Sequence, residues 1–346
     1  MTKQQRIGAF VRLKAFLDRH FSKTFLNEET QLHEGLNALL DTAFTYNGWF
    51  SRNFTEEALK NIALMLDEKE LDVFCKPIPE NVEAKRVAVI CAGNIPLVCF
   101  HDVMCVLLSG HQLIVKMSED DKVLLPFFLK LLVHYEPGFD EKIRFAHGRL
   151  SEFDAVIATG SNNTAKHFEF YFSKYPNIIR KNRSSVAVIN GDETTADFQE
   201  LGKDIFTYYG LGCRNVGKLL VPKGYQFDAF FEGIYGFGEV ANNNKYGNNY
   251  DYHRSLYLLE SLPFLDNNFL ILKESRDLHS PISVLFYQEY ENQQELEAYL
   301  ETNRDSLQCV VGKGHIPFGC SQKPVISEFA DGVNTLDFLV HLSRSV

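Results

Sequence analysis

Short apolar segments alternate with helix-length segments through the middle of this chain, and that alternation most restricts the folds it can adopt. The apolar segments are Arg86–Cys91, Leu113–Met117, Lys142–Ala146, Asp154–Thr159 and Val186–Asn190. Between them we expect helices at 96–109, 121–134, 162–174 and 195–209. Near-continuous apolar strands separated by helices predict a parallel sheet covered on both faces, and so an α/β fold.

The pattern is less regular toward the C-terminus. Strands are expected at Val216–Val221, Phe269–Lys273, Ile282–Tyr287 and Gln308–Val311, with helices near 226–235 and 292–303. The Asn- and Tyr-rich segment Ala241–Tyr252 is expected to be a loop. At the N-terminus, residues 5–47 carry apolar positions at helical spacing, and another helix is expected to start near Thr55.

Composition excludes several classes of protein. The 346 residues are 45% hydrophobic and 23% charged, which suffices for a sizeable core. The net charge of −10 argues against a nucleic-acid or anionic-membrane partner. Seven cysteines without a C-x-x-C pair, and an N-terminus without a signal-peptide core, predict a soluble, reduced, cytoplasmic protein with no membrane span. The eleven histidines show no metal-ligand spacing, so no metal site is expected.

One cysteine lies on a glycine-flanked turn, Gly210-Leu211-Gly212-Cys213-Arg214-Asn215, between a helical run (198–209) and an expected strand. A nucleophile must be exposed to meet a substrate, and a helix-to-strand junction would expose the Cys213 thiol. Only the thiolate attacks, so the turn must stabilise that form. A serine nucleophile is disfavoured because the sequence contains no G-x-S-x-G.

Polar residues follow two expected strands at the sheet edge where α/β proteins bind ligands. Asn94 comes after Arg86–Cys91, and its amide suits either an oxyanion or a simple turn. Lys116, Ser118 and Glu119 end the next strand. A lysine and a carboxylate there can hold ribose hydroxyls, while Ser118 alternatively caps the following helix.

A third strand delivers Thr159, Gly160 and Ser161 to the start of a helix, where they suit a phosphate, a nicotinamide or a helix cap. The sequence has no G-x-G-x-x-G and no Walker loop, so an ordinary Rossmann or P-loop site is not expected. The basic run Arg180-Lys181-Asn182-Arg183 predicts a solvated turn, with steering of a phosphorylated cofactor as the alternative. His101, within an apolar helix, is expected to be a satisfied core histidine.

Taken in order, these segments resemble the aldehyde dehydrogenase superfamily. Asn94-Ile95-Pro96-Leu97 resembles its Asn-Phe-Pro segment, whose asparagine supports the oxyanion. Lys116-Met117-Ser118-Glu119 resembles its ribose-binding Lys-Pro-Ser-Glu, and Thr159-Gly160-Ser161 its Thr-Gly-Ser beside the cofactor. Gly210-Leu211-Gly212-Cys213 matches the position of the nucleophilic cysteine, and Pro317-Phe318-Gly319 a late Pro-Phe-Gly segment. The resemblance covers roughly residues 85 to 340.

One departure indicates a branch of that superfamily. Aldehyde-oxidising members carry a glutamate, the general base for thioester hydrolysis, before a Gly-Gly-Lys-Ser run; here the matching stretch, 180–186, has no carboxylate. The chain is similar instead to the acyl-CoA reductases of the bacterial luminescence type (LuxC-like). The similar segments are Gly93-Asn94-Ile95-Pro96, His101-Asp102-Val103, Leu108-Ser109-Gly110-His111, Arg180-Lys181-Asn182-Arg183 and Gly212-Cys213-Arg214-Asn215.

The resemblance implies a Rossmann-type nucleotide-binding lobe (81–205), a second α/β catalytic lobe with the nucleophilic cysteine (206–320) and a C-terminal return segment (321–346), preceded by the helical N-terminal region (1–80). It implies NADPH-dependent reduction of an acyl-CoA to an aldehyde through an acyl-cysteine on Cys213. Asn94 would hold the oxyanion, and Lys116, Ser118, Glu119, Thr159, Gly160 and Ser161 would hold the cofactor. NADH is the alternative cofactor, because a Glu119 carboxylate would repel a 2′-phosphate.

Two other functions stay open on the sequence. One is an acyl-phosphate reductase of the glutamate-5-semialdehyde dehydrogenase kind, which also lacks the hydrolytic glutamate. The other is a non-catalytic nucleotide-binding subunit that serves an acyl-activating protein. The expected partners are an acyl-CoA or acyl-protein thioester, an acyl-activating partner protein and further copies of the chain in a homo-oligomer.

Overall fold

Helices form the N-terminal region, as the apolar spacing predicts. The computed structural model describes residues 1–160 and 162–343. Its first helices are α1 (Lys3–Ser22), α2 (Thr30–Tyr46), α3 (Arg52–Met65) and α4 (Glu68–Phe74). A capping box starts α1, because the Thr2 hydroxyl accepts the Gln5 N–H and the Gln5 side chain accepts the Thr2 N–H. The buried face of α1 carries Phe10, Leu13, Phe16 and Leu17.

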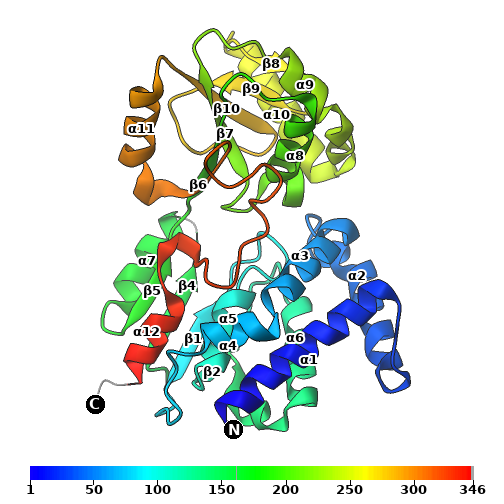
Figure 1. The fold of residues 1–346 in the computed structure, drawn as a ribbon, viewed down its shortest axis with the longest axis vertical. Coiled ribbons are helices and arrows are strands. Elements are labelled where there is room, and N and C mark those ends of the chain that lie inside the picture. The colour runs from blue at the N-terminus through cyan, green and yellow to red at the C-terminus, as the bar shows by residue number, and fades with distance from the viewer. Residues whose placement is uncertain (161, 344–346) are drawn as a thin grey trace. The chain divides into compact units, whose positions relative to one another are not determined.

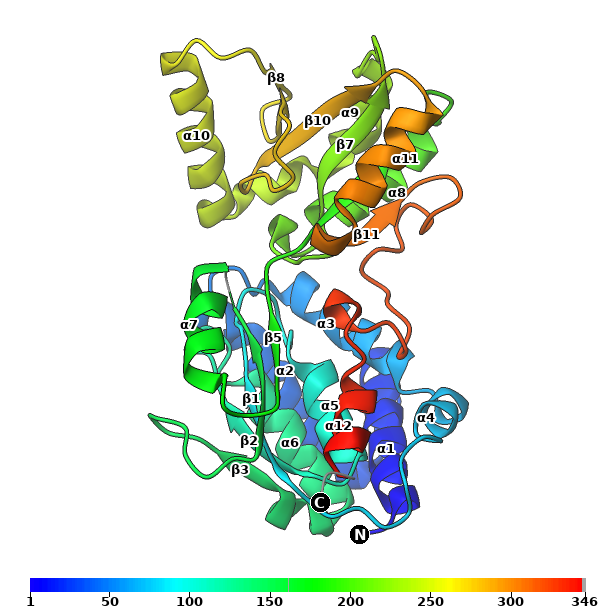
Figure 2. The same ribbon diagram turned by 90° about the vertical axis from the view of Figure 1, so that its left-hand side faces the viewer.

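The chain forms two compact units, each built around its own sheet (Figure 1; Figure 2). Unit 1 contains residues 1–181 and the described residues from Pro324 on, and unit 2 contains Asn182–Lys323. Unit 2 is therefore inserted into the sequence of unit 1. The expected boundary between residues 205 and 206 lies inside unit 2, and most of the expected return segment belongs to unit 1.

Unit 1 contains a parallel sheet in the order β3-β2-β1-β4-β5. The strands are β1 (Arg86–Ile90), β2 (Gln112–Lys116), β3 (Ile143–Phe145), β4 (Ala155–Thr159) and β5 (Asn177–Arg180), of which β5 was not among the expected segments. Successive strands run outward from β1 to one side and then resume on its other side at β4. Such a switch point is where open α/β sheets bind ligands, beyond the carboxyl ends of the strands.

Helices cover both faces of the unit 1 sheet, as the near-continuous apolar strands predict. They are α5 (Phe100–Leu108), α6 (Leu124–Tyr135), α7 (Asn162–Phe172) and α12 (Thr335–Leu342). Val87 and Val89 of β1 join the large core with α1, α5, α6 and α12. Ala88 points to the other face, where it packs in a smaller cluster with Phe168 and Phe172 of α7. The period of two along β1 thus separates two cores.

Unit 2 contains a second sheet in the order β11-β6-β7-β10-β9-β8. Its strands are β6 (Ser184–Val188), β7 (Val216–Pro222), β8 (Leu265–Asp266), β9 (Ile271–Glu274), β10 (Val284–Tyr290) and β11 (Leu307–Val311). Neighbours are parallel except β8 and β9. The helices are α8 (Thr195–Phe206), α9 (Asp228–Ile234), α10 (Asn244–Leu259) and α11 (Gln293–Thr302). Both lobes are α/β, as expected.

The expectation of a loop at Ala241–Tyr252 is wrong, because α10 begins inside that segment. Asparagine and glycine have low helix propensity, which makes the sequence typical of a loop. In the structure the Asn243 side chain caps the helix by accepting the N–H groups of Lys245 and Tyr246. Tyr246 and Tyr250 are buried on one face, and the Tyr246 hydroxyl donates to the Phe269 carbonyl. Burial of the tyrosines overrides the local preference.

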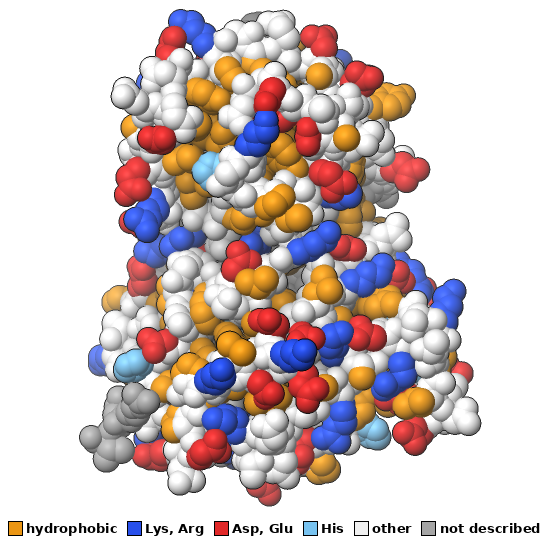
Figure 3. Space-filling model, in the orientation of Figure 1, with side chains coloured by type: hydrophobic (Ala, Val, Ile, Leu, Met, Phe, Trp, Pro, Cys, Tyr) orange, Lys and Arg blue, Asp and Glu red, His pale blue; other side chains and the backbone are white. Residues whose placement is uncertain are grey.

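Short 3-10 helices complete the secondary structure. They are η1 (Asn27–Glu29), η2 (Pro137–Lys142), η3 (Thr207–Gly210), η4 (Tyr235–Asn242), η5 (Arg304–Ser306) and η6 (Ala330–Gly332). Across the described residues, no helix has both the length and the apolar character to cross a membrane. The face shown in Figure 3 carries Lys, Arg, Asp and Glu side chains mixed together rather than separated by sign.

Candidate active site

The turn that carries Cys213 follows directly on α8. The helix ends at Phe206, and Tyr208 (φ 53°), Tyr209 (φ 58°) and Gly210 (φ 79°) are all in the left-handed region. Two tyrosines in that region are strained, which indicates a turn held in place by its surroundings. The chain then passes through Cys213, which is exposed, and enters β7. The sequence correctly located this residue at an exposed helix-to-strand junction.

Asn215 ties the turn to the end of α8. Its Oδ1 accepts the Gly212 N–H at 2.8 Å, and its own N–H donates to the Gly212 carbonyl at 3.0 Å. Its Nδ2 donates to the carbonyls of Asp204 (3.0 Å), Ile205 (3.3 Å) and Thr207 (2.8 Å). These are carbonyls that a helix end leaves without an intrahelical partner. The buried Asn215 side chain therefore both caps α8 and closes the cysteine turn.

The late Pro317-Phe318-Gly319 segment lies beside this turn within unit 2. Asp204 on α8 accepts the N–H groups of Gly319 (2.7 Å) and Ser321 (2.9 Å). Arg214, next to Cys213, donates to the Ser321 carbonyl. Burial raises the pKa of Asp204. Two segments about a hundred positions apart that carry the family resemblance are therefore joined through one carboxylate and one guanidinium.

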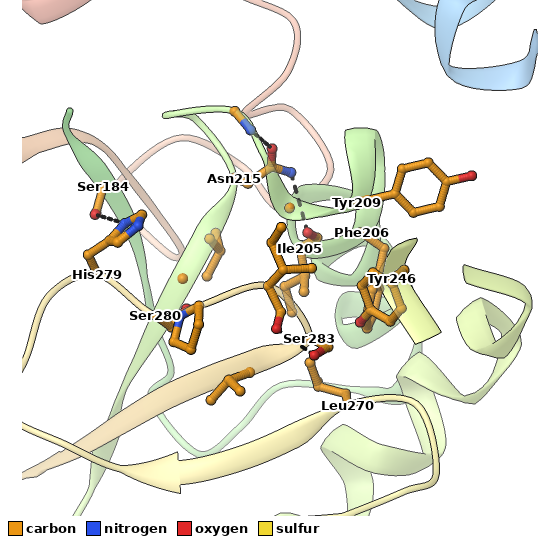
Figure 4. Close-up of a pocket in the computed structure, with 17 residues that line it drawn as sticks. Ser184, Ile205, Phe206, Tyr209, Asn215, Tyr246, Leu270, His279, Ser280 and Ser283 are labelled. Carbon is orange, nitrogen blue, oxygen red and sulfur yellow. Dashed lines mark hydrogen bonds between the residues drawn. The ribbon is translucent and has the colours of Figure 1, made fainter. Parts of the chain in front are cut away.

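A pocket opens behind the cysteine turn, at the amino end of the unit 2 sheet (Figure 4). Gly210, Gly212 and Asn215 of the turn line it. Figure 4 shows a polar side with Ser184 and His279, and an aromatic side formed by residues of α8, η3 and α10. Ser184 Oγ lies 3.3 Å from His279 Nδ1. The aromatic side consists of Phe206, Tyr209 and Tyr246.

The candidate cofactor residues collect at the carboxyl edge of the unit 1 sheet. Ile90 pairs with Lys116 of β2 and with Ala158 of β4, so the loops after these three strands are neighbours. A Cβ on Gly93 would lie 2.5 Å from Ser118 Oγ, which no real side chain tolerates. Glycine at position 93 therefore permits the close approach of the first two loops.

Within these loops Lys116 and Ser118 bond to the backbone, whereas the Glu119 side chain extends into solvent. Lys116 Nζ donates to the Gly148 carbonyl at 3.0 Å, and Ser118 Oγ accepts the Asp120 N–H at 3.2 Å. The Glu119 side chain is 96% exposed and has Lys122 Nζ at 3.6 Å. An ammonium, a hydroxyl and an exposed carboxylate form a donor and acceptor set that suits ribose hydroxyls.

Asn94 and Thr159 also lie at this edge. Asn94 is exposed in the loop after β1, and Leu97 of that loop (φ 57°) donates its N–H to Asp121 Oδ2 at 2.9 Å. Burial raises the pKa of Asp121 to about 6. Thr159 pairs with Arg180 of β5, and Gly160 donates its N–H to the Arg180 carbonyl at 3.4 Å. Ser161 lies outside the described residues.

The expectation that Arg180 lies in a solvated turn is wrong. Arg180 is buried, and its guanidinium binds both carboxylate oxygens of Asp102, at 3.2 Å and 2.7 Å. It also donates to Thr335 Oγ1 at 2.7 Å and to the Ala330 carbonyl. His101 satisfies its ring through the Ile326 carbonyl at 2.8 Å. The Arg180–Asp102 ion pair and His101 thus hold the C-terminal segment against α5 inside unit 1.

Sequence reasoning gave no role to several residues around the cysteine. They are Ser184, Ser185, Asp204, Asn215 and His279. An asparagine two positions after Cys213 was a usable signal, because asparagine side chains commonly bond a nearby backbone N–H. Nothing local in the sequence indicated the others. Among residues 1–160 and 162–343 no cluster of His, Cys, Asp and Glu suited to a metal ion occurs.

Comparisons with known proteins agree with this architecture. Residues 14–229 match the sequence model of the family described as acyl-CoA reductase (LuxC). Among curated proteins none matches the sequence.

Solved structures of aldehyde dehydrogenases are similar in fold. The KauB aldehyde dehydrogenase of Pseudomonas aeruginosa has a TM-score of 0.62 and 13% identity, over 90% of this chain and 72% of that one. The P. syringae AldA indole-3-acetaldehyde dehydrogenase, solved with NAD+ and IAA, has a TM-score of 0.61 and 12% identity, over 90% and 72%. A Mycobacterium tuberculosis aldehyde dehydrogenase complexed with NAD+ has a TM-score of 0.58 and 12% identity, over 96% and 84%. The expected aldehyde dehydrogenase-like fold is therefore confirmed.

Proposed function

The chain belongs to the LuxC acyl-CoA reductase family, and on that premise we propose that it reduces an acyl-CoA to an aldehyde through an acyl-cysteine on Cys213. The family and the fold together establish that the chain is an oxidoreductase related to aldehyde dehydrogenases. The observation that carries the finer proposal is the exposed Cys213 on a turn tied down at both ends. A rigidly held, accessible thiol is what covalent catalysis requires.

The first chemical step is acyl transfer to the enzyme. The Cys213 thiolate sulfur bonds to the thioester carbonyl carbon, the bond from that carbon to the CoA sulfur breaks, and CoA leaves as a thiolate that takes up a proton. Negative charge develops on the carbonyl oxygen meanwhile. From the family resemblance we assign the Asn94 amide as a donor to that oxygen.

The second step needs a reductant, and the residues at the edge of the unit 1 sheet fit a nicotinamide nucleotide. Lys116, Ser118 and Glu119 would hold its ribose, with Thr159 and Gly160 on the neighbouring strand end. The bound nicotinamide would supply a hydride to the acyl carbon. The bond from that carbon to the Cys213 sulfur then breaks, which releases the aldehyde and restores the thiolate.

Loss of the hydrolytic base favours reduction over oxidation. The stretch 180–186 has no carboxylate, and its first residue is occupied by the ion pair with Asp102. Water would therefore lack a general base at this position for attack on the acyl-cysteine. An acyl-enzyme that resists hydrolysis persists long enough to be reduced.

Glu119 and the family resemblance favour different nicotinamide cofactors. The Glu119 carboxylate is exposed, with Lys122 Nζ at 3.6 Å, so it is available to ribose hydroxyls and unfavourable for a 2′-phosphate. The family resemblance implies NADPH. We propose NADPH with NADH as the competing cofactor, and expect Glu119→Gln to raise the ratio of NADPH to NADH activity.

The test is intact-mass spectrometry after incubation with medium- and long-chain acyl-CoA. Wild type should gain one acyl group, Cys213→Ala should gain none, and NADPH or NADH should reverse the gain. Cys320→Ala is the matched control, because Cys320 is a half-buried cysteine of the same unit. If no acyl-CoA labels wild type, the acyl-CoA proposal fails, and labelling by an acyl phosphate would support that alternative instead. Cofactor binding without any labelling would favour the non-catalytic subunit.

A further inference from the structure

We propose that Ser185 is a positioning residue for the Cys213 nucleophile. Its effect on catalysis rests on the proposed function, whereas its effect on the reactivity of the thiol does not. Ser185 is fully buried in β6, and its Oγ donates to the Cys213 carbonyl at 2.8 Å. Neither the short sequence motifs nor the family resemblance gives this serine a role.

Ser185 occupies an irregular point of the unit 2 sheet. The pairing of β6 with β7 shifts register between Ser185 and Val186. On the other side of β6, the pairing with β11 shifts register between Leu307 and Val310. An irregular pairing re-aims a side chain out of the ordinary alternation, and such irregularities are common beside active sites. Here Ser185 lies at the shift in register, and its side chain contacts the cysteine turn.

The hydroxyl of Ser185 joins three segments. Besides donating to the Cys213 carbonyl, Oγ accepts the Cys309 N–H at 3.2 Å and has Cys309 Sγ at 3.0 Å. A serine hydroxyl has a single proton to donate. Because that proton is directed at Cys213, the contacts with Cys309 serve to orient the oxygen. The bond therefore transmits the rigidity of β6 and β11 to the turn.

Together with Asn215, this bond fixes every peptide plane around Cys213. The plane before Gly212 is held by the Gly212 N–H on Asn215 Oδ1. The plane between Gly212 and Cys213 is held by the Gly212 carbonyl, which accepts the Asn215 N–H. The plane after Cys213 is held by Ser185 Oγ. With all three planes fixed, the directions of the Cys213 Cα–Cβ bond and N–H are set.

Fixed geometry matters because acyl transfer is sensitive to placement. Donors that stabilise an oxyanion act only if they are already aimed where the charge develops. A displacement of about 1 Å at a reacting group can lower a rate by about 100-fold. Asn215 also caps α8, so its loss would disturb the fold as well. Ser185 is therefore the cleaner position for a test.

The experiment compares Ser185→Ala and Ser185→Val with Ser185→Thr, which keeps the hydroxyl and has the shape of valine. Ser109→Ala is the matched control: Ser109 is a buried serine of unit 1 whose hydroxyl also donates to a backbone carbonyl, that of Val106. The first measurement is the rate of Cys213 alkylation by iodoacetamide as a function of pH. The second is acyl transfer from acyl-CoA, separated into kcat and KM, with thermal unfolding as the measure of stability.

We expect Ser185→Ala and Ser185→Val to lower kcat by about 10- to 100-fold with KM nearly unchanged. Their alkylation rate and its pH profile should change, whereas Ser185→Thr should keep both near wild type. Ser109→Ala should lose a similar amount of stability, with no change in the alkylation rate of Cys213 or in kcat. The proposal is overturned if folded Ser185→Ala alkylates Cys213 and turns over at wild-type rates. It is also overturned if Ser185→Ala and Ser185→Val fail to fold and Ser185→Thr folds, because Ser185 would then be needed for folding. If wild type is not acylated but the alkylation differences appear, the proposed function fails and the positioning role stands.

Discussion

Two ion pairs of unit 1 and two buried charged side chains of unit 2 are used in different ways. In the two pairs of unit 1, opposite charges bind each other: Arg180 binds Asp102, and Arg19 binds Glu29, each through both carboxylate oxygens. In unit 2, Asp204 and Lys218 bind backbone and amide groups instead. Lys218 donates to the carbonyls of Arg276 and Asp277 and to Gln288 Oε1. The pairs of unit 1 neutralise their charges, whereas Asp204 and Lys218 hold loops. Asp121 of unit 1, which accepts the Leu97 N–H, resembles Asp204 in this respect.

This difference appears in the pKa values. Although burial disfavours its charge, Arg180 holds the pKa of Asp102 below the ordinary value. In unit 2, burial raises the pKa of Asp204 and lowers that of Lys218 to about 8. Buried charges without an opposite partner are costly and are kept where they organise something. In unit 2 the organised segments include the cysteine turn and the loop before β10.

The sequence provides a way to observe one unit alone. Its single tryptophan is Trp49, which lies in unit 1. Tryptophan fluorescence therefore reports unfolding of unit 1, while far-ultraviolet circular dichroism reports both units. Predictions about the two kinds of buried charge can be separated on this basis.

The largest effect is expected from breaking the buried pair of unit 1. Asp102→Asn leaves the Arg180 charge buried without a carboxylate, which should cost about 3–5 kcal/mol in the free energy of unfolding measured by Trp49 fluorescence in urea. Lys181→Gln is the control, because Lys181 forms an exposed pair with Glu169 and should cost under about 1 kcal/mol. Equal losses in the two variants would contradict the comparison.

A smaller and more local effect is expected from Asp204→Ala in unit 2. The N–H groups of Gly319 and Ser321 lose their acceptor, at a cost of about 2–3 kcal/mol. Hydrogen exchange should quicken at these two amides and around Cys213, while the Trp49 transition stays in place. Gln199→Ala, on the same helix and exposed, should leave exchange unchanged. A shift of the Trp49 transition would show that the units are not independent.

A titration in unit 1 should appear through Asp121. Its folded pKa of about 6 lies above the ordinary 3.8, so the folded state holds the proton that the unfolded state releases. Its contribution to stability is present below about pH 4 and is lost as the pH rises through 6, by about 3 kcal/mol. The difference between Asp121→Asn and wild type in urea should therefore grow with pH over this range. A difference independent of pH would disprove the assignment.

An effect of opposite sign is expected from Lys218 in unit 2. Its folded pKa of about 8 lies below the ordinary 10.5, so the unfolded state holds a proton that the folded state releases between these values. Stability should rise with pH from about 8 to 10.5, by about 3 kcal/mol. Circular dichroism in urea should show this rise in wild type and not in Lys218→Met. A rise of equal size in both would assign it to other groups.

The predictions from sequence succeeded where a pattern is local and failed where packing decides. Apolar runs located β1, β2, β4, β7 and β10, because a buried parallel strand must be apolar throughout. The short β5 and the helix α10 were missed, since one is brief and the other is rich in poor helix formers. For the site, Cys213 and the strand-end residues could be located from turns and strand ends. Ser185 and Asp204 could not, because their partners are distant in sequence.

The sequence by itself determined the α/β class, the family and the position of an exposed cysteine between a helix and a strand. These follow from residue periodicity and short motifs, which act over a few neighbouring positions. Only the tertiary structure decided that Arg180 is buried against Asp102, that Asp204 holds the segment at 319–321, and that Ser185 reaches the Cys213 carbonyl. Each of these contacts joins residues 28 to 117 positions apart. Their geometry depends on strand order and register, which no local pattern encodes.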